Sequence, residues 1–125
     1  MTENELSYKI RGATYNVYKI LGPGLLENAY ETALCYELRE MGLSVERQIS
    51  LPLRYKGVEI DGGYRIDLMV EEKVIIEVKS IAGIAPVHHK QLLTYLKLTN
   101  LKLGLLINFN VEVINSGITR IVNGL

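Results

Sequence analysis

Apolar residues recur at steps of three and four along the first part of the chain, which is the spacing of an amphipathic helix. Leu6, Ile10 and Ala13 belong to this stripe, which predicts a helix over Glu3–Leu21. The Gly-Pro-Gly sequence at 22–24 then ends the helix.

A second helix is predicted over Leu26–Met41, with Gly42 as its C-cap. At 100° per residue, Glu37 falls inside its apolar sector and Glu27 on the edge, whereas Cys35 falls on the polar side. An acid on a core-facing side needs a partner, a metal ion or a proton. Glu27 either fills such a role or complements the helix dipole, and Glu37 is expected to be a structural partner. The sector itself consists of Leu26, Ala29, Tyr30, Ala33, Leu34 and Met41.

Alternation of apolar and polar residues replaces the helical spacing after Gly42. It predicts an extended segment over Leu43–Tyr55, with Pro52 indicating an edge or a bend. Turn residues at 56–57 and 61–63 enclose Val58–Ile60, which is expected to pair back.

The stretch Tyr64–Lys79 is predicted to form a hairpin with a charged turn. Glu77 and Lys79 are two apart in its second strand, so they share a face. Asp67, in the first strand, joins that face only if the loop has an odd number of residues, for example residues 71–73. A two-residue loop would place the two acids on opposite faces, and this turn lacks the glycine typical of three-residue loops.

A helix over Pro86–Leu98 and a strand over Lys102–Phe109 follow the hairpin. The near-continuous apolar run of that strand is typical of a strand buried on both faces. The order strand, helix, strand predicts that Lys73–Lys79 and Lys102–Phe109 are parallel neighbours. Ile118–Val122 adds a short last strand, so the predicted class is α/β with a mixed sheet.

Composition limits the kinds of protein that this chain can be. The chain has 125 residues, enough for one domain, and 14 basic and 14 acidic residues balance its charge. A protein that coats nucleic acid non-specifically is usually more basic, so any such binding requires a local patch or a partner. The single cysteine and the lack of a signal or membrane-spanning run predict a cytoplasmic protein.

Polar residues of the last predicted helix are expected to lie beside the two acids of the hairpin. His88, Gln91 and Tyr95 share one face of that helix, which begins beside the end of the strand that carries Glu77 and Lys79. Such a cleft suits metal-assisted hydrolysis of a phosphodiester, with Asp67 and Glu77 as ligands of Mg²⁺ or Mn²⁺. The alternative is a cross-strand salt-bridge ladder without a metal ion.

Each polar residue has an expected task in this chemistry. Lys79 would orient the attacking water or stabilise the developing charge, and Gln91 would position water or phosphate. His88 would contact phosphate or protonate the leaving group, whereas Tyr95 would form hydrogen bonds or serve only in packing.

The sequence Gly24-Leu-Leu-Glu27-Asn-Ala-Tyr30 resembles the motif of the GxxExxY protein family, which is grouped with the PD-(D/E)XK nuclease-like superfamily. The later residues from Asp67 to the L-L-I-N-F strand follow in the order of that family. The resemblance implies a restriction-endonuclease-like mixed sheet with an αβββαβ core, two N-terminal helices and a crossover helix, in a single domain over 1–125. It implies Asp67, Glu77 and Lys79 as motif residues and Glu27 as an acid that assists metal binding, although Ile66 replaces the proline of the superfamily name.

Two functions are consistent with these patterns. The first is a Mg²⁺- or Mn²⁺-dependent nuclease acting on DNA, preferred here over RNA. The second is a non-catalytic nucleic-acid-binding or protein-interaction module on the same fold. A homodimer is also expected, since one small domain offers little surface for a duplex.

Overall fold

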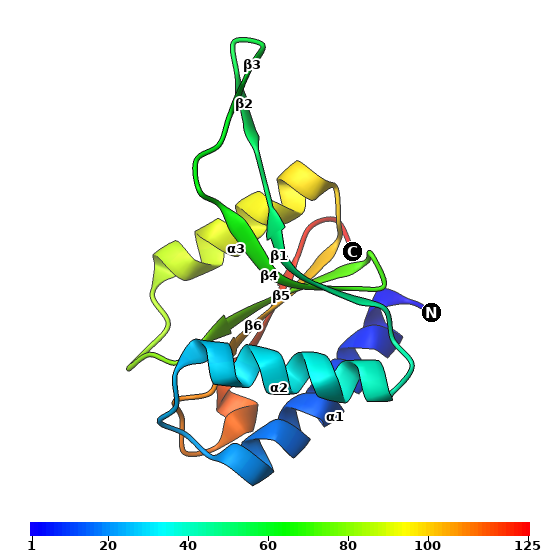
Figure 1. Cartoon of the computed structure of the whole chain (residues 1–125), viewed down its shortest axis with the longest axis vertical. Coiled ribbons are helices and arrows are strands. Elements are labelled where there is room, and N and C mark those ends of the chain that lie inside the picture. The colour runs from blue at the N-terminus through cyan, green and yellow to red at the C-terminus, as the bar shows by residue number, and fades with distance from the viewer.

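The computed structural model describes all residues 1–125, with helices and strands in the order shown in Figure 1. None of the helices combines the length and apolar character that crossing a membrane requires. The elements are α1 Glu3–Leu21, α2 Glu27–Glu40, β1 Val45–Ser50, β2 Leu53–Tyr55, β3 Val58–Ile60, β4 Arg65–Val70, β5 Val74–Lys79, α3 Pro86–Thr99, β6 Leu103–Asn108, the 3-10 helix η1 Ile114–Gly117, and β7 Ile118–Val122.

Five strands form one mixed sheet in the order β1-β4-β5-β6-β7. β5 and β6 run parallel and are joined by α3, which confirms the predicted strand–helix–strand crossover. The other neighbouring pairs of this sheet are antiparallel. The predicted α/β class is therefore confirmed, and α2, β1, β4, β5, α3 and β6 provide the αβββαβ order.

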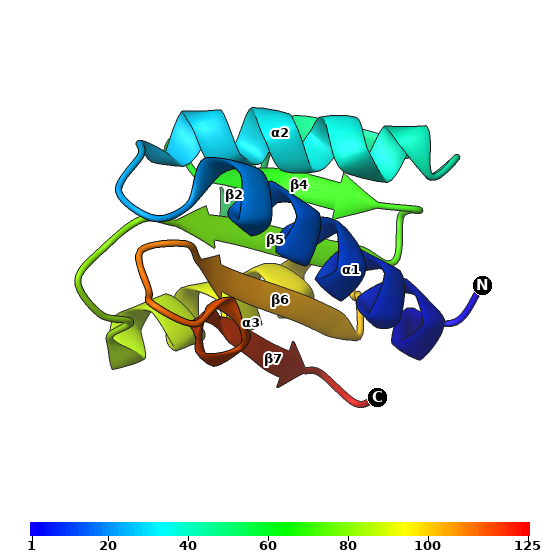
Figure 2. The same cartoon turned by 90° about the horizontal axis from the view of Figure 1, so that it is seen from below.

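Helices cover both faces of the sheet (Figure 2). α1 and α2 lie on one face, where Leu68 and Ile76 point into the larger core. α3 lies on the other face, where its Leu92 packs in a smaller core with Ile75. Because β5 is buried on both sides, its only buried charged residue, Glu77, is largely removed from water.

The β4–β5 hairpin has the register that places Asp67 across from Glu77. Val70 pairs with Val74, so the loop consists of residues 71–73. The odd-numbered loop on which the sequence argument depended is therefore confirmed. Asp67 and Glu77 therefore lie opposite each other on neighbouring strands.

This loop has a left-handed backbone without glycine. Glu71 and Glu72 have φ values of 53° and 54°, a region that side chains disfavour. Glu71 is held there by Ser44, whose N–H donates to the Glu71 carboxylate at 2.7 Å and whose carbonyl accepts from the Glu71 N–H at 2.8 Å. These two hydrogen bonds to Ser44, in the segment before β1, thus hold Glu71 in a backbone conformation that otherwise favours glycine.

The stretch Leu43–Tyr55, predicted as one extended segment, is divided in two. β1 ends at Ser50, and β2 pairs with β3 in a separate two-stranded hairpin. Pro52 lies between β1 and β2 and has no N–H to contribute to a continuous ladder. Figure 1 shows this hairpin projecting from the body of the molecule, and every residue of β3 is exposed.

The buried face of α2 differs from the predicted one. Leu26 and Met41, counted in the apolar sector, are 83% and 40% exposed at the two ends of the helix. The prediction that Cys35 lies on the polar side is wrong, because it is 2% exposed in the larger core. The buried acid of this helix is Glu31, whereas Glu37 is partly exposed. The residues that α2 buries are Tyr30, Glu31, Leu34, Cys35 and Leu38.

Candidate functional site

Asp67 and Glu77 meet where β4 and β5 separate. The backbone pairing of the two strands ends at Leu68 and Ile76. Beyond it, the Asp67 N–H donates to Glu77 Oε2 at 2.8 Å, and the Val78 N–H donates to Asp67 Oδ2 at 2.8 Å. Each carboxyl group thus satisfies a backbone amide of the opposite strand. The exchange fixes both carboxyl groups beside each other at the carboxyl end of β5.

Burial and mutual repulsion favour the protonated form of this carboxyl pair. Glu77 is 5% exposed, and this desolvation, followed by the charge of Asp67, raises its pKa from 4.5 to about 8. Burial also raises the pKa of Asp67, against the lowering effect of its bond from the Val78 amide. Lys79 lowers both pKa values by its charge but forms no ion pair within 4.0 Å. The pair therefore retains a proton at neutral pH.

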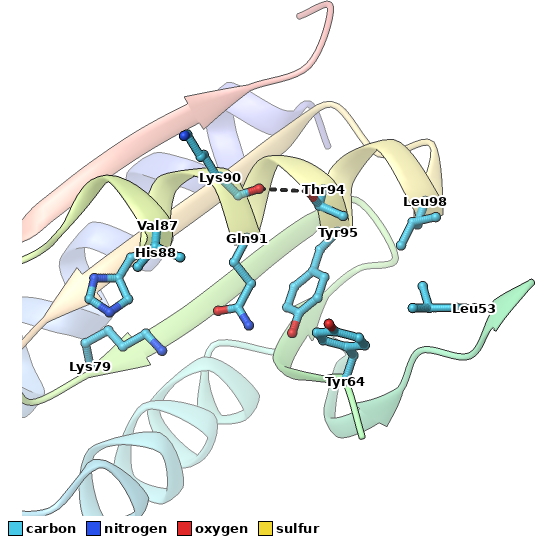
Figure 3. A pocket seen from close by; sticks show the side chains of 10 residues that line it. All are labelled: Leu53, Tyr64, Lys79, Val87, His88, Lys90, Gln91, Thr94, Tyr95 and Leu98. Atoms are coloured by element: carbon cyan, nitrogen blue, oxygen red, sulfur yellow. Dashed lines mark hydrogen bonds between the residues drawn. The ribbon is translucent and has the colours of Figure 1, made fainter. Parts of the chain in front are cut away.

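Four of the residues predicted from the sequence line one groove beside this pair (Figure 3). Lys79 reaches the groove from β5, and His88, Gln91 and Tyr95 reach it from α3. The groove has a volume of about 580 Å³. Since α3 begins shortly after β5 ends, its first turns lie beside the end of that strand.

His88 and Tyr95 also have structural roles. His88 Nδ1 accepts a hydrogen bond from the Ala85 N–H at 2.9 Å, which caps the start of α3. In the neutral ring this bond places the proton on Nε2, the nitrogen that remains for a ligand. Tyr95 is 3% exposed, and burial, followed by the charge of Glu77, raises its pKa to about 12. Its hydroxyl group is therefore neutral at physiological pH.

Glu27 lies at the same end of β5 as Lys79. It is the first residue of α2, and its Oε1 accepts from the N–H of Ser80 at 3.4 Å, directly after β5. No three His, Cys, Asp or Glu side chains are grouped closely enough to hold a metal ion together. The structure therefore presents Asp67 and Glu77 as a pair, with Glu27 nearby.

The turn before Glu27 depends on other residues of the same motif. Gly24 has a φ of 97°, which a larger residue would adopt only with strain. The Tyr30 hydroxyl donates to the Gly22 carbonyl at 2.5 Å and accepts from the Leu25 N–H at 3.0 Å. The glycine and the tyrosine thus shape the turn that brings Glu27 to the end of β5.

The structure adds three residues to the site that the sequence analysis did not single out. Glu31, one turn after Glu27, is 5% exposed and forms an ion pair with Arg47 at 3.0 Å. Glu31 also accepts from Gln48 Nε2 at 2.7 Å, and the same nitrogen lies 3.4 Å from Asp67 Oδ1. Gln48 therefore connects α2 to the carboxyl pair.

The sequence contains a signal for only one of these residues. Glu31 follows Glu27 by four positions, so helical spacing makes the two acids neighbours on α2. In a regular strand, however, Arg47 and Gln48 would point to opposite faces. Gln48 instead has a φ of 50°, and both side chains reach Glu31. No pattern along the chain predicts this backbone conformation.

One family model matches nearly the whole chain. It describes the PD-(D/E)XK nuclease superfamily, and the match covers residues 4–121. Neither the curated proteins nor the solved structures gave a match. The matched range includes the carboxyl pair, Lys79 and the groove residues of α3, so the family and the geometry refer to the same part of the chain.

Proposed function

We propose that this chain, which belongs to the PD-(D/E)XK nuclease superfamily, is a nuclease that uses a divalent metal ion to hydrolyse phosphodiester bonds of DNA or RNA. The observation that carries the proposal is the exchange of hydrogen bonds that holds Asp67 and Glu77 together. Lys79 stands two residues further along β5. In a surface salt-bridge ladder this lysine would pair with one of the acids, and it forms no such pair.

The oxygen atoms at this point suit Mg²⁺ or Mn²⁺. Carboxylate and carbonyl oxygens are the ligands that these ions prefer, and Mg²⁺ usually keeps several waters, so one or two carboxylates suffice. Asp67 and Glu77 would hold the ion, with the main-chain carbonyl of Val78 as a further ligand and Glu27 assisting from the edge. When bound, such an ion neutralises charge on the phosphate and lowers the pKa of a water molecule.

The side chains around the pair would complete the chemistry. Lys79 is half-buried without an ion pair, so its charge is available to orient the attacking water and to stabilise the charge that develops on phosphate. Gln91 would position water or phosphate from α3. His88 would donate a hydrogen bond from its Nε2–H to phosphate, and Tyr95 would contribute a neutral hydroxyl.

Metal binding is the first test. We expect calorimetric titration with Mn²⁺ to give binding for the wild type and none for Asp67→Asn, which keeps an acceptor for the Val78 amide. Glu46→Gln, at an exposed position of β1, is the matched control and should bind like the wild type. Equal affinity of the wild type and Asp67→Asn for Mn²⁺ would remove the metal site from the proposal.

Cleavage distinguishes a nuclease from a module that only binds. Single-stranded, duplex and branched DNA and RNA would be incubated with Mn²⁺, and we expect the wild type and Glu46→Gln to cut at least one of them. Lys79→Ala should cut the same substrate about 10²–10³-fold more slowly. Binding without any cleavage, unchanged in Lys79→Ala, would instead support a non-catalytic nucleic-acid-binding or protein-interaction module.

Finer assignments belong to the same proposal. The motif from Gly24 to Tyr30 supports placing the chain in the GxxExxY family within the superfamily. We also propose that residues 1–125 act as one domain in the cytoplasm and as a homodimer. Sedimentation at micromolar concentration tests the last point, and a monomer would refute it.

A further inference from the structure

The groove beside the carboxyl pair extends well past its reacting end. It follows α3 from Lys79 and His88 to Leu53 and Leu98 (Figure 3). The helix rises by about 15 Å between His88 and Leu98. Its outer part, at Leu53 and Leu98, lies beyond the end at Lys79 where the reaction is proposed, so that part is suited to holding a ligand and not to the reaction itself.

Apolar side chains line this groove although solvent reaches them. Val87 and Leu98 on α3 are 64% and 49% exposed, and Leu53 lies at the base of the projecting β2–β3 hairpin. The charged side chains of the groove are Lys79 and Lys90, and no acid lines it. Two cations among apolar walls suit a ligand whose flat apolar faces are joined by anionic groups. A neutral or basic peptide would leave the lysines without partners.

Tyr64 provides an aromatic surface in this groove. It is 41% exposed, and its ring meets Tyr95 edge to face, with centroids 6.4 Å apart. On another side the ring lies over Gly62, where an added Cβ would come within 2.8 Å of a ring carbon. These contacts fix the ring, so stacking on it would cost little side-chain entropy.

We propose that this groove binds an unpaired stretch of nucleic acid and stacks one nucleobase on Tyr64. Lys79 and Lys90 contact the phosphates, while Leu53 and Leu98 enclose the base. The bases of a duplex are stacked on one another, and its outer surface presents phosphates, so a duplex does not offer a base face to this ring. The inference rests on the proposed function, and it defines the substrate as a single strand or a structure with a single-stranded end or branch.

Oligonucleotide binding in EDTA tests the inference without cleavage. Fluorescence anisotropy would compare a labelled single strand with the same strand annealed to its complement. We expect the wild type to bind the single strand at least about tenfold more tightly than the duplex. Tyr64→Leu should raise the Kd for the single strand by about tenfold, and Tyr64→Phe should restore wild-type affinity.

Matched variants separate stacking from general effects. Tyr15→Leu is the control, because Tyr15 is 46% exposed on α1, on the other face of the sheet, and its loss should leave the Kd unchanged. Gly62→Ala keeps Tyr64 but displaces its ring, so it should also weaken binding. If circular dichroism shows that Tyr64→Leu is unfolded, Leu98→Ala on the exposed surface of α3 takes its place, with an expected several-fold loss of affinity.

Every other outcome overturns the inference. Equal affinity for single strand and duplex, an unchanged Kd in Tyr64→Leu, or no oligonucleotide binding at all would each do so. Binding of an apolar peptide in place of the oligonucleotide would indicate a protein partner instead.

The two proposals fail in different ways. Single-strand binding that depends on Tyr64, without cleavage in Mn²⁺, would refute the nuclease and keep the groove assignment. Cleavage of duplex and single strand at equal rates, unchanged in Tyr64→Leu, would keep the nuclease and refute the groove assignment.

Discussion

Replacing Glu77 with glutamine should flatten the dependence of stability on pH in the metal-free protein. Folding buries Glu77 between β4 and β5 and raises its pKa from 4.5 to about 8. Between these values the unfolded chain releases a proton that the folded chain still holds. The free energy of unfolding therefore falls as the pH rises through this window. The contribution of Glu77 to stability is complete below pH 4.5 and lost above about pH 8.

The two pKa values set the size of this loss. At 1.36 kcal/mol per pH unit, the span from 4.5 to about 8 corresponds to roughly 5 kcal/mol. The raised pKa of Asp67 acts in the same direction. Domains are typically stable by about 5–15 kcal/mol, so the metal-free protein would be close to unfolding at alkaline pH. An ion bound to the ionised carboxyl pair, as proposed, would reverse this loss, because only the folded state brings the two groups together.

Urea unfolding in EDTA, followed by circular dichroism across this pH window, measures the effect. Glu77→Gln keeps an acceptor for the Asp67 N–H and should lose most of the slope. Glu46→Gln, exposed on β1, should keep the wild-type slope. Addition of Mn²⁺ at the alkaline end should stabilise the wild type and leave Glu77→Gln unchanged. Equal slopes for the wild type and Glu77→Gln would refute the assignment of the buried proton to this site.

Three further predictions concern single residues. Lys79→Ala should lower the single-turnover cleavage rate by about 10²–10³-fold while Mn²⁺ affinity, measured by calorimetry, stays the same; a loss of affinity instead would make Lys79 structural. Glu72→Gly should stabilise the protein to urea by about 1 kcal/mol, because exposed Glu72 has a φ of 54°; no gain would mean that the turn is unstrained. Tyr30→Phe keeps the ring stack on Phe109 but removes the hydroxyl group that bonds to two backbone groups of the α1–α2 turn. It should lower the free energy of unfolding in urea by about 1–3 kcal/mol, and an unchanged value would contradict the role of the hydroxyl in the turn.

Periodic segments of the sequence predicted the fold well. The apolar run of β6 and the helix signals around Pro86 were sufficient for the parallel β5–β6 pair, because a crossover between parallel strands has few solutions. The register of the β4–β5 hairpin required more than periodicity, since both loop lengths fit the pattern. The family resemblance favoured the odd loop, and the pairing of Val70 with Val74 agrees with it.

Features that depend on contacts between distant segments could not be predicted in this way. The predicted phase of α2 is wrong because Leu26 and Met41 carry apolar side chains that lie exposed at the two ends of the helix. With that phase, Glu31 falls outside the predicted apolar sector, and its spacing of four from Glu27 is the only signal for it in the sequence. Its partners Arg47 and Gln48 come from β1, and one of them reaches it through a left-handed backbone that no local pattern indicates.

The conformation of Gln48 and the burial of Glu77 have a common origin at Asp67. In the β1–β4 pairing, Arg47 and Ile49 have partners but Gln48 has none. The position opposite Gln48 is Asp67. On the β5 side, Asp67 forms no backbone pair. Its N–H bonds to the carboxyl group of Glu77, and its own carboxyl group accepts from the Val78 N–H. The sheet is thus interrupted on both sides of one residue.

Each interruption carries a free-energy cost in the metal-free protein. On the β1 side the cost is a left-handed non-glycine residue, and on the β5 side it is a carboxyl group that must keep its proton. A regular sheet would avoid both costs, but it would direct Asp67 away from the Val78 amide. The separated strands hold two carboxyl groups together in advance, so an ion bound there as proposed would meet ligands that are already placed, and it would displace the proton that the pair retains at neutral pH.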